Sequence, residues 1–258
     1  MLRLPAIKCK KGMRKDPNDP ISFLCAWLAL VPQALCIVYA TLIWSSREAE
    51  VALMFAGQLG CEAVNFILKR IIKEERPPKI QITGKGYGMP SSHAQFVAFW
   101  AVSLTLFLLV RHRPSAKTHR FRRRDNGGGA GVVKGNGQWV TAADVERYAH
   151  RPWSMLERAA ASLVALVLAG LVAWSRVYLC YHTGKQVMVG SLAGALTAVA
   201  WFVITAVARQ VGLLAWAVDQ PVARWFRVRD LVVGEDLCQA GWEKWEDQVF
   251  AAEQAKKK

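Results

Sequence analysis

Charged residues are scarce in this chain. They make up only 21% of its 258 residues, whereas hydrophobic residues make up 53%. The charges gather between long apolar runs, and the mean hydropathy is +0.17. This composition excludes an ordinary soluble domain and indicates a protein that crosses a membrane several times. The first twenty residues are basic and contain no apolar core, so we expect no cleavable signal peptide.

Paired cysteines and clustered carboxylates are also lacking. The six cysteines contain no C-x-x-C pair and no zinc spacing, so we expect all six to be free thiols or packing residues. Acidic residues number 19 against 34 Lys and Arg, and no carboxylate cluster is suited to Mg²⁺. We therefore expect no metal and no other cofactor.

The net charge of +15 suggests anionic partners. Nucleic acid is one kind, and the basic run from Arg120 to Arg124 is the segment that would bind it. In a membrane protein such runs usually mark the cytosolic side. We therefore expect membrane lipids as partners and no nucleic acid.

Five apolar segments predict an all-α bundle of about five transmembrane helices, because a span needs roughly 20 residues. Pro32 lies inside the first and should kink it. The predicted spans are residues 21–44, 51–72, 94–110, 159–174 with the stretch that follows, and 187–208. The predicted domains are a basic arm (1–20), a membrane domain (21–210) with a polar, disordered insertion (111–158), and an amphipathic tail (211–258).

The end of the second span carries two cations in the pattern Lys69-x6-Arg76-Pro77. Glu62, Asn65 and Lys69 fall on one helix face, which should look into the bundle because a carboxylate facing lipid is costly. For Glu62 and Asn65 we favour a structural role. The pre-proline position should end the helix near Arg76.

The third span begins at Pro90-Ser91-Ser92-His93. Ser91 or Ser92 can cap the helix, and the exposed N–H groups and dipole of its first turn favour an anion. His93 stands beside that position. An ordinary capped helix with an interfacial histidine is an equally good interpretation of this segment alone.

The fourth span ends in Ser175-Arg176-x5-His182. Seven residues are nearly two helical turns, so Ser175 and His182 can face one way, with Arg176 close to that face. Ionisable groups at this depth suggest a functional site. The alternative is a snorkelling arginine and an unrelated histidine.

With five spans, all three segments emerge on one side of the membrane. Three cations, two hydroxyls, a helix N-terminus and two imidazoles would then meet there. Such a set predicts a phosphate-binding site with two groups that can act as nucleophile or handle protons.

The three motifs together resemble those of the type 2 phosphatidic acid phosphatase superfamily. The similarity covers roughly residues 20–210, and the wider context at 88–96 and 175–183 resembles its dolichol branch. Two positions depart from the superfamily pattern. Ser92 stands where glycine is usual, and Gln186 stands four residues after His182, where an aspartate often orients the histidine. A glutamine can still accept an imidazole N–H, but it supplies no charge.

The resemblance implies a metal-free phosphatase acting on dolichyl diphosphate. His182 would be the nucleophile and His93 the proton donor and acceptor, and Gln186 would orient His182. Arg176 would be catalytic together with the two histidines. The residues that would hold the phosphate are Arg176, Lys69, Arg76, Ser91 and Ser92. Two alternatives stay open: another lipid phosphatase, acting on phosphatidate, sphingoid phosphate or undecaprenyl diphosphate, and a non-catalytic binder or transporter of lipid phosphates.

The charge bias predicts which way the site faces. The site side carries 14 Lys and Arg, and the other side carries 20. Because positive residues favour the cytosol, we expect the site to face the lumen of the endoplasmic reticulum.

Overall fold

The computed structural model describes residues 19–76, 87–113, 133–135, 138–140 and 153–234. The chain divides into two compact units. The first comprises residues 1–111 and 158–230, and the second comprises residues 112–157 and 231–258. The membrane-spanning helices belong almost entirely to the first unit.

Helices dominate the first unit. Five segments are long and apolar enough to cross a membrane, which confirms the predicted bundle of five spans. The helices are α1 (Pro20–Leu28), α2 (Val31–Ser46), α3 (Ala49–Ile72), α4 (Ser92–Leu106) with the π-helical turn η2 (Phe107–Arg111), α6 (Met155–Tyr178), α7 (Gly184–Gln210), α8 (Leu213–Asp219) and α9 (Pro221–Trp225).

The helices extend beyond the apolar runs that predicted them. α6 begins at Met155 and α7 at Gly184, each a few residues before the expected start. Polar end turns add little to hydropathy, so the apolar signal underestimates helix length. The kink expected from Pro32 is a break at residues 29–30, and Pro32 itself occupies the first turn of α2, where a missing N–H costs no hydrogen bond.

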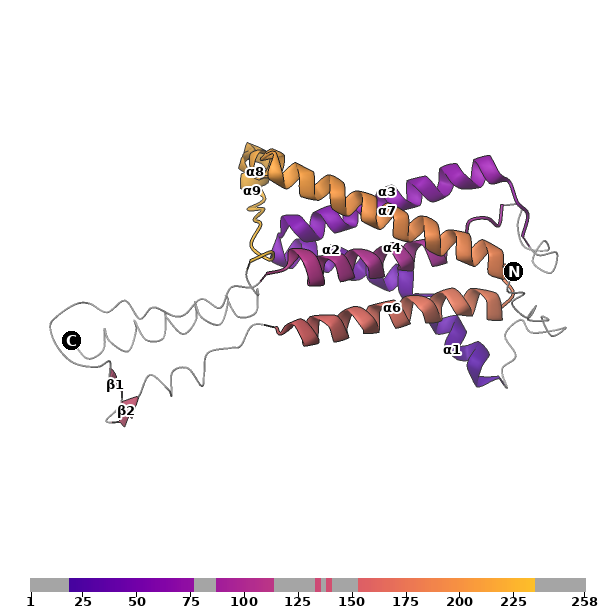
Figure 1. The fold of residues 1–258 in the computed structure, drawn as a ribbon, viewed down its shortest axis with the longest axis horizontal. Helices are drawn as coiled ribbons and strands as arrows, with labels where there is room; N and C mark the ends of the chain where they lie inside the picture. Colours follow the sequence, from indigo (N-terminus) through magenta and orange to yellow (C-terminus); the bar gives the residue numbers. More distant parts are fainter. Residues whose placement is uncertain (1–18, 77–86, 114–132, 136–137, 141–152, 235–258) are drawn as a thin grey trace. The chain divides into compact units, whose positions relative to one another are not determined.

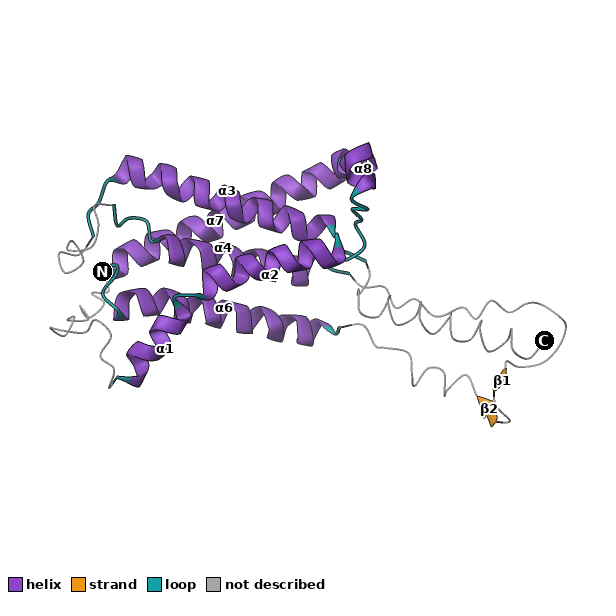
Figure 2. Ribbon diagram, turned by 180° about the vertical axis from the view of Figure 1, so that it is seen from behind, coloured by secondary structure: helices purple, strands orange, loops and turns teal. Residues whose placement is uncertain are grey.

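α4 is the central helix of the bundle, and Val97, Phe99 and Ala101 on it are almost fully buried. Figure 2 shows α4 beside α7 and α2. The glycines of α7 allow close contact with α4, because a Cβ added at Gly194 would lie 2.2 Å from the carbonyl oxygen of Gln95. This agrees with the close packing expected of a helix rich in small residues.

Replacing Gly194 by alanine is expected to destabilise the bundle by about 1–3 kcal/mol, because α7 must move away from α4. The measurement is thermal unfolding of the purified protein in detergent. Gly170→Ala is the matched control, since a Cβ there meets no heavy atom within 4 Å. Equal melting temperatures for the two variants would contradict the prediction.

Buried amides join α3 to α4. Asn65 Nδ2 donates to Gln95 Oε1 at 2.7 Å, and Gln95 Nε2 donates to the carbonyl of Cys61 at 2.9 Å. The polar face of α3 therefore looks into the bundle, as predicted, and Asn65 has the structural role expected of it. Glu62 lies close enough to Lys69 for the two charges to interact.

The end of the bundle away from the predicted site is held by an ionic network. The buried carboxylate of Glu50 pairs with Arg111 and with Arg209, both at 2.5 Å, and Arg209 also pairs with Asp230. The network links the start of α3 to the ends of η2 and α7. It keeps these charges paired where a single buried one would be costly.

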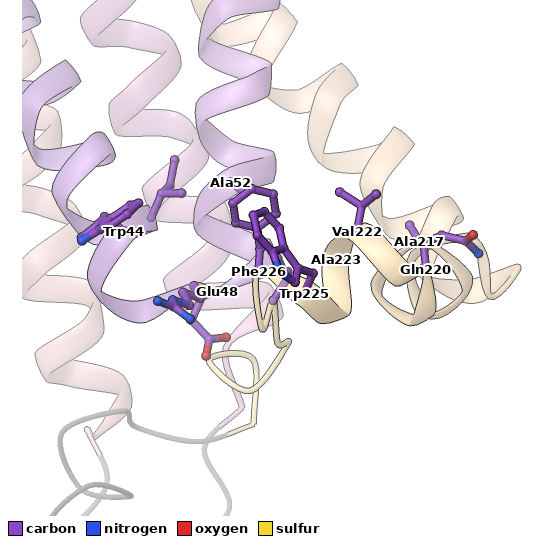
Figure 3. A pocket seen from close by; sticks show the side chains of 12 residues that line it. Trp44, Glu48, Ala52, Ala217, Gln220, Val222, Ala223, Trp225 and Phe226 are labelled. Atoms are coloured by element: carbon purple, nitrogen blue, oxygen red, sulfur yellow. The ribbon is translucent and has the colours of Figure 1, made fainter.

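An apolar pocket of about 600 Å³ opens at the same end. Figure 3 shows that Trp44, Trp225 and Phe226 line it, together with residues at the start of α3 and in α8. No residue of the three motifs lines this pocket. This apolar pocket is therefore separate from the predicted chemistry.

The second unit contains the only strands among the described residues. β1 (Val133–Gly135) and β2 (Gln138–Val140) pair antiparallel, with Val133 opposite Val140. Both strands lie within the predicted insertion (111–158). Residues 114–132, 136–137 and 141–152 of the insertion lie outside the described ranges, so its disorder stays a prediction. The helix predicted for the tail also falls mostly outside them, since residues 235–258 are not described.

The cysteines differ from expectation at one position. Cys25, Cys36 and Cys61 are free, as predicted. Cys180 is disulfide-bonded, so the prediction of a free thiol is wrong there. Sequence spacing did not reveal it, because disulfide pairing cannot be deduced from cysteine spacing alone.

Candidate active site

The three sequence motifs meet at one end of the bundle. In Figure 1 the end of α3, the start of α4, the end of α6 and the start of α7 lie together at the right. Main-chain hydrogen bonds join the segments: Ser91 N donates to the carbonyl of Gln186 at 3.2 Å, and Gly88 N donates to that of Glu74 at 2.7 Å. The convergence inferred from membrane topology is therefore present.

A tight turn after α6 positions His182. Cys180 has a left-handed φ of 58°, and the backbone N–H groups of Tyr181 and His182 both donate to the carbonyl of Arg176, at 3.0 and 3.3 Å. The chain folds back over the end of α6 and enters α7 immediately. Thr183 caps α7 in a reciprocal capping box with Gln186.

Gln186 orients the imidazole of His182. Its Oε1 lies 3.2 Å from His182 Nδ1, and its Nε2 donates to Glu74 Oε1 at 3.1 Å and to the carbonyl of Glu75 at 2.9 Å. Two acceptors on the nitrogen side fix the amide, so its oxygen faces the histidine. His182 Nδ1 must then carry the proton, which leaves the lone pair on Nε2.

His182 is neutral at physiological pH. It is only 8% exposed. Burial lowers its pKa to about 4, and the positive charges of Arg76 and Lys69 act in the same direction against its hydrogen bond with Gln186. The ring also hydrogen-bonds with the backbone of Gly88. A buried, neutral imidazole whose Nε2 carries the lone pair is suited to nucleophilic attack.

His93 shares one of its neighbouring cations, Lys69, with His182. It stands in the first turn of α4, hydrogen-bonds with the backbone of Ala29, and experiences the charges of Arg176 and Lys69. Lys69 acts on both imidazoles. The two histidines therefore share one positively charged site.

Arg176 is almost fully buried, with 4% exposure. Its guanidinium donates to Ser175 Oγ at 3.2 and 3.1 Å and to the carbonyl of Cys25 at 3.4 Å, and it lies over the Tyr181 ring at 5.4 Å. These contacts hold the group without neutralising it. Its charge stays available for an anion.

Two buried polar atoms of the motifs have no hydrogen-bond partner among the described residues. They are Ser91 Oγ and Arg76 Nε. Ser91 is the N-cap residue of α4 and is fully buried, but its side chain makes no capping bond. Ser92 follows as the first helical residue and is partly buried. Buried donors without partners are costly, and a phosphate oxygen would satisfy both.

The acid side of the pH–rate profile should reflect the low pKa of His182. If His182 is the nucleophile, as the sequence predicts, activity needs its imidazole neutral. We then expect the contribution of His182 to the acid limb of kcat/KM near pH 4 instead of near 6.5. Replacing Arg76 by glutamine removes a positive charge, which must raise that pKa and move the limb to higher pH. Ionisation of the substrate affects wild type and Arg76→Gln alike. An acid limb at the same pH in both proteins would therefore contradict the assignment of that limb to His182.

Sequence reasoning missed two parts of this site. α1 supplies the backbone carbonyl of Cys25 to Arg176, and the backbone of Ala29 to His93. Glu74 supplies a carboxylate to Gln186. For α1 the sequence carried no signal. For Glu74 there was one, because an acidic residue stands inside the otherwise cationic pattern from Lys69 to Arg76.

Comparison with known proteins agrees with this geometry. The PAP2 superfamily matches residues 49–210, which include all three motifs. A Neurospora crassa protein named "Putative dolichyldiphosphatase" is 63% identical over 253 residues, covering 92% of this chain and 90% of that protein. Human "Dolichyldiphosphatase 1" is 34% identical over 222 residues, covering 83% and 76% respectively.

The "Dolichyldiphosphatase" of Saccharomyces cerevisiae is 29% identical over 221 residues, covering 83% of this chain and 77% of that protein. No solved structure matches the chain significantly. The matched residues contain both histidines and the cations around them. The chain therefore belongs to the PAP2 superfamily, and within it to the dolichyldiphosphatase family of lipid phosphatases.

Proposed function

We propose that this protein hydrolyses dolichyl diphosphate to dolichyl phosphate and inorganic phosphate through a phosphohistidine on His182. The observation that carries the proposal is the state of His182: it is buried, neutral, anchored at Nδ1 and beside the charges of Arg76 and Lys69. The names of the relatives support the substrate. A site at the end of the membrane helices suits a lipid whose diphosphate lies at the surface while its chain stays in the bilayer.

In the first step, the lone pair of His182 Nε2 attacks the terminal phosphorus. The bond from that phosphorus to the bridging oxygen breaks, and His93 donates a proton to the departing dolichyl phosphate. Arg176, Arg76 and Lys69 stabilise the charge that spreads over the transferring oxygens. Ser91 and Ser92 complete the phosphate site with hydroxyl and main-chain donors at the start of α4.

In the second step, water attacks the phosphohistidine. His93, now deprotonated, accepts a proton from the water, the P–N bond breaks, and inorganic phosphate leaves. Both histidines return to their starting states. We infer that no metal is required, because three cationic side chains supply the charge that a metal would otherwise provide.

We further propose that the site faces the lumen of the endoplasmic reticulum, where the product would re-enter the pool of lipid carrier for protein N-glycosylation. The excess of Lys and Arg on the opposite side supports this orientation. The disulfide at Cys180, two residues from His182, also supports it, because such bonds persist in oxidising compartments.

The direct experiment is phosphate release from dolichyl diphosphate in EDTA, beside phosphatidate, sphingoid phosphate and undecaprenyl diphosphate. We expect release in the chelator and the highest kcat/KM for the dolichyl substrate. Preference for a glycerol or sphingoid phosphate would overturn the substrate assignment, and loss of activity restored by added metal would overturn the metal-free reaction. Glycosylation tags in the 111–158 loop test orientation, and their modification would place the site in the cytosol.

A further inference from the structure

The residue that orients His182 has no charge. In a phosphohistidine mechanism the imidazole ring becomes positive when Nε2 bonds to phosphorus, and a carboxylate at Nδ1–H would stabilise that charge. Gln186 occupies this position and offers only an amide oxygen, at 3.2 Å. The negative charge must come from elsewhere if the ring is stabilised at all.

A carboxylate lies immediately behind the amide. Gln186 Nε2 donates to Glu74 Oε1 at 3.1 Å, while its Oε1 faces His182. The hydrogen bonds therefore run from the imidazole N–H to the amide oxygen, and from the amide nitrogen to the carboxylate. A negative charge at the end of such a chain polarises the amide and makes its oxygen a stronger acceptor.

The backbone places Glu74 firmly for this contact. Its carbonyl accepts from Gly88 N at 2.7 Å, and Glu75 forms an antiparallel bridge with Tyr87. A Cβ added at Gly88 would lie 2.9 Å from Gln186 Nε2 and 3.0 Å from Arg76. The segment after α3, the Gly88 backbone and Gln186 are thus packed without spare room.

We propose that Glu74 is the remote carboxylate of His182, a positioning residue that acts through Gln186 and stabilises the positive imidazole formed during phosphoryl transfer. The proposal rests on the proposed function. It assigns to the first motif, otherwise a phosphate-binding element, a second role in supporting the nucleophile. Glu74 would thus supply, through another residue, the charge that an aspartate supplies directly in a Ser-His-Asp triad.

The charge of Glu74 is maintained by its surroundings. The hydrogen bond from Gln186 and the one from Lys185 Nζ, at 3.2 Å, hold the pKa of this carboxyl below its ordinary value. The Lys185 pair is exposed, with 72% of the lysine side chain and 32% of the glutamate side chain accessible, so solvent screens it. The contact with Gln186 is the better shielded of the two, because Gln186 is only 1% exposed.

The decisive variant is Glu74→Gln, which removes the charge but keeps an oxygen that can accept from Gln186. We expect kcat for dolichyl diphosphate to fall about tenfold with little change in KM, the lower end of what loss of a histidine's outer partner costs. A purely structural role would leave kcat unchanged in this isosteric variant or lower the melting temperature together with it. Wild-type kcat in Glu74→Gln would overturn the proposal.

Lys185→Ala is the matched control. It removes the other partner of Glu74 and leaves the contact with Gln186 in place, so we expect kcat within about twofold of wild type for a pair this exposed. If Lys185→Ala lowers kcat as much as Glu74→Gln does, the surface ion pair is responsible and the proposed chain through Gln186 is wrong.

A charge exchange provides a second test. Gln186→Glu alone puts two carboxylates side by side and should be strongly impaired, because like charges so close cannot both ionise easily. In the double variant Glu74→Gln with Gln186→Glu, the carboxylate at position 186 contacts His182 directly, and the amide at position 74 lies behind that carboxylate. We expect kcat above that of Gln186→Glu, and a double variant no better than the single would count against the proposal.

These outcomes separate the two proposals. If wild-type protein releases no phosphate in EDTA, or if phosphate release does not depend on His182, the proposed function itself fails. If His182 is required and Glu74→Gln retains wild-type kcat, only the role of Glu74 fails.

Discussion

Replacing His182 by alanine is expected to abolish phosphate release, with kcat reduced by at least about 10⁴-fold, as for loss of a covalent nucleophile in other enzymes. No other described imidazole has an Nδ1 paired with a glutamine oxygen beside the cations of the site. The remaining charges can still bind the lipid diphosphate, so binding should persist while turnover is lost.

The measurement is phosphate release from dolichyl diphosphate, with ³²P labelling of the protein under an alkaline quench that preserves phosphohistidine. Wild type should incorporate label and His182→Ala should not. Gly184→Ala is a suitable control beside the site, because an added Cβ there meets no heavy atom within 4 Å. A labelled, active His182→Ala protein would exclude His182 as the nucleophile.

Replacing His93 by alanine is expected to lower kcat by about 10²–10⁴-fold, the range for removal of a general acid–base group. The loss should depend on the leaving group, because an alkyl phosphate needs a proton from His93 and a nitrophenolate does not. With p-nitrophenyl phosphate, His93→Ala should therefore form the phosphohistidine quickly and hydrolyse it slowly.

The expected signature is a burst of about one equivalent of nitrophenol from His93→Ala and none from His182→Ala, in line with the covalent-intermediate scheme. Both variants should retain the melting temperature of wild type to within a few degrees, which separates a chemical effect from a folding defect. Equal impairment of His93→Ala towards both substrates, without a burst, would contradict its role as proton donor to the leaving group.

The bundle and its motifs could be read largely from the chain. Apolar length alone predicted five spans, because insertion in a bilayer depends on local hydrophobicity. The five-span topology then placed Lys69, Ser91 and His182 on one membrane side. Main-chain and electrostatic contacts at the ends of α3, α4, α6 and α7 now bring the three motifs together.

Other features depended on contacts between distant residues and had no local signal. Cys180 is disulfide-bonded, and its spacing to the other cysteines did not predict this. The backbones of Cys25 in α1 and of Ala29 at its C-cap contact Arg176 and His93. Such contacts have no sequence signal, because every residue carries the same backbone carbonyl.

By itself, the order of residues predicted five helices long and apolar enough to cross a membrane and a cationic site with two histidines, because both follow from residue type and spacing. Only the tertiary structure decided how that site is arranged: which way the Gln186 amide points, which nitrogen of His182 faces it, and that Glu74 accepts from the amide on its other side. The reason is physical. A hydrogen bond has direction as well as chemistry, and direction exists only once the segments that supply donor and acceptor have packed together.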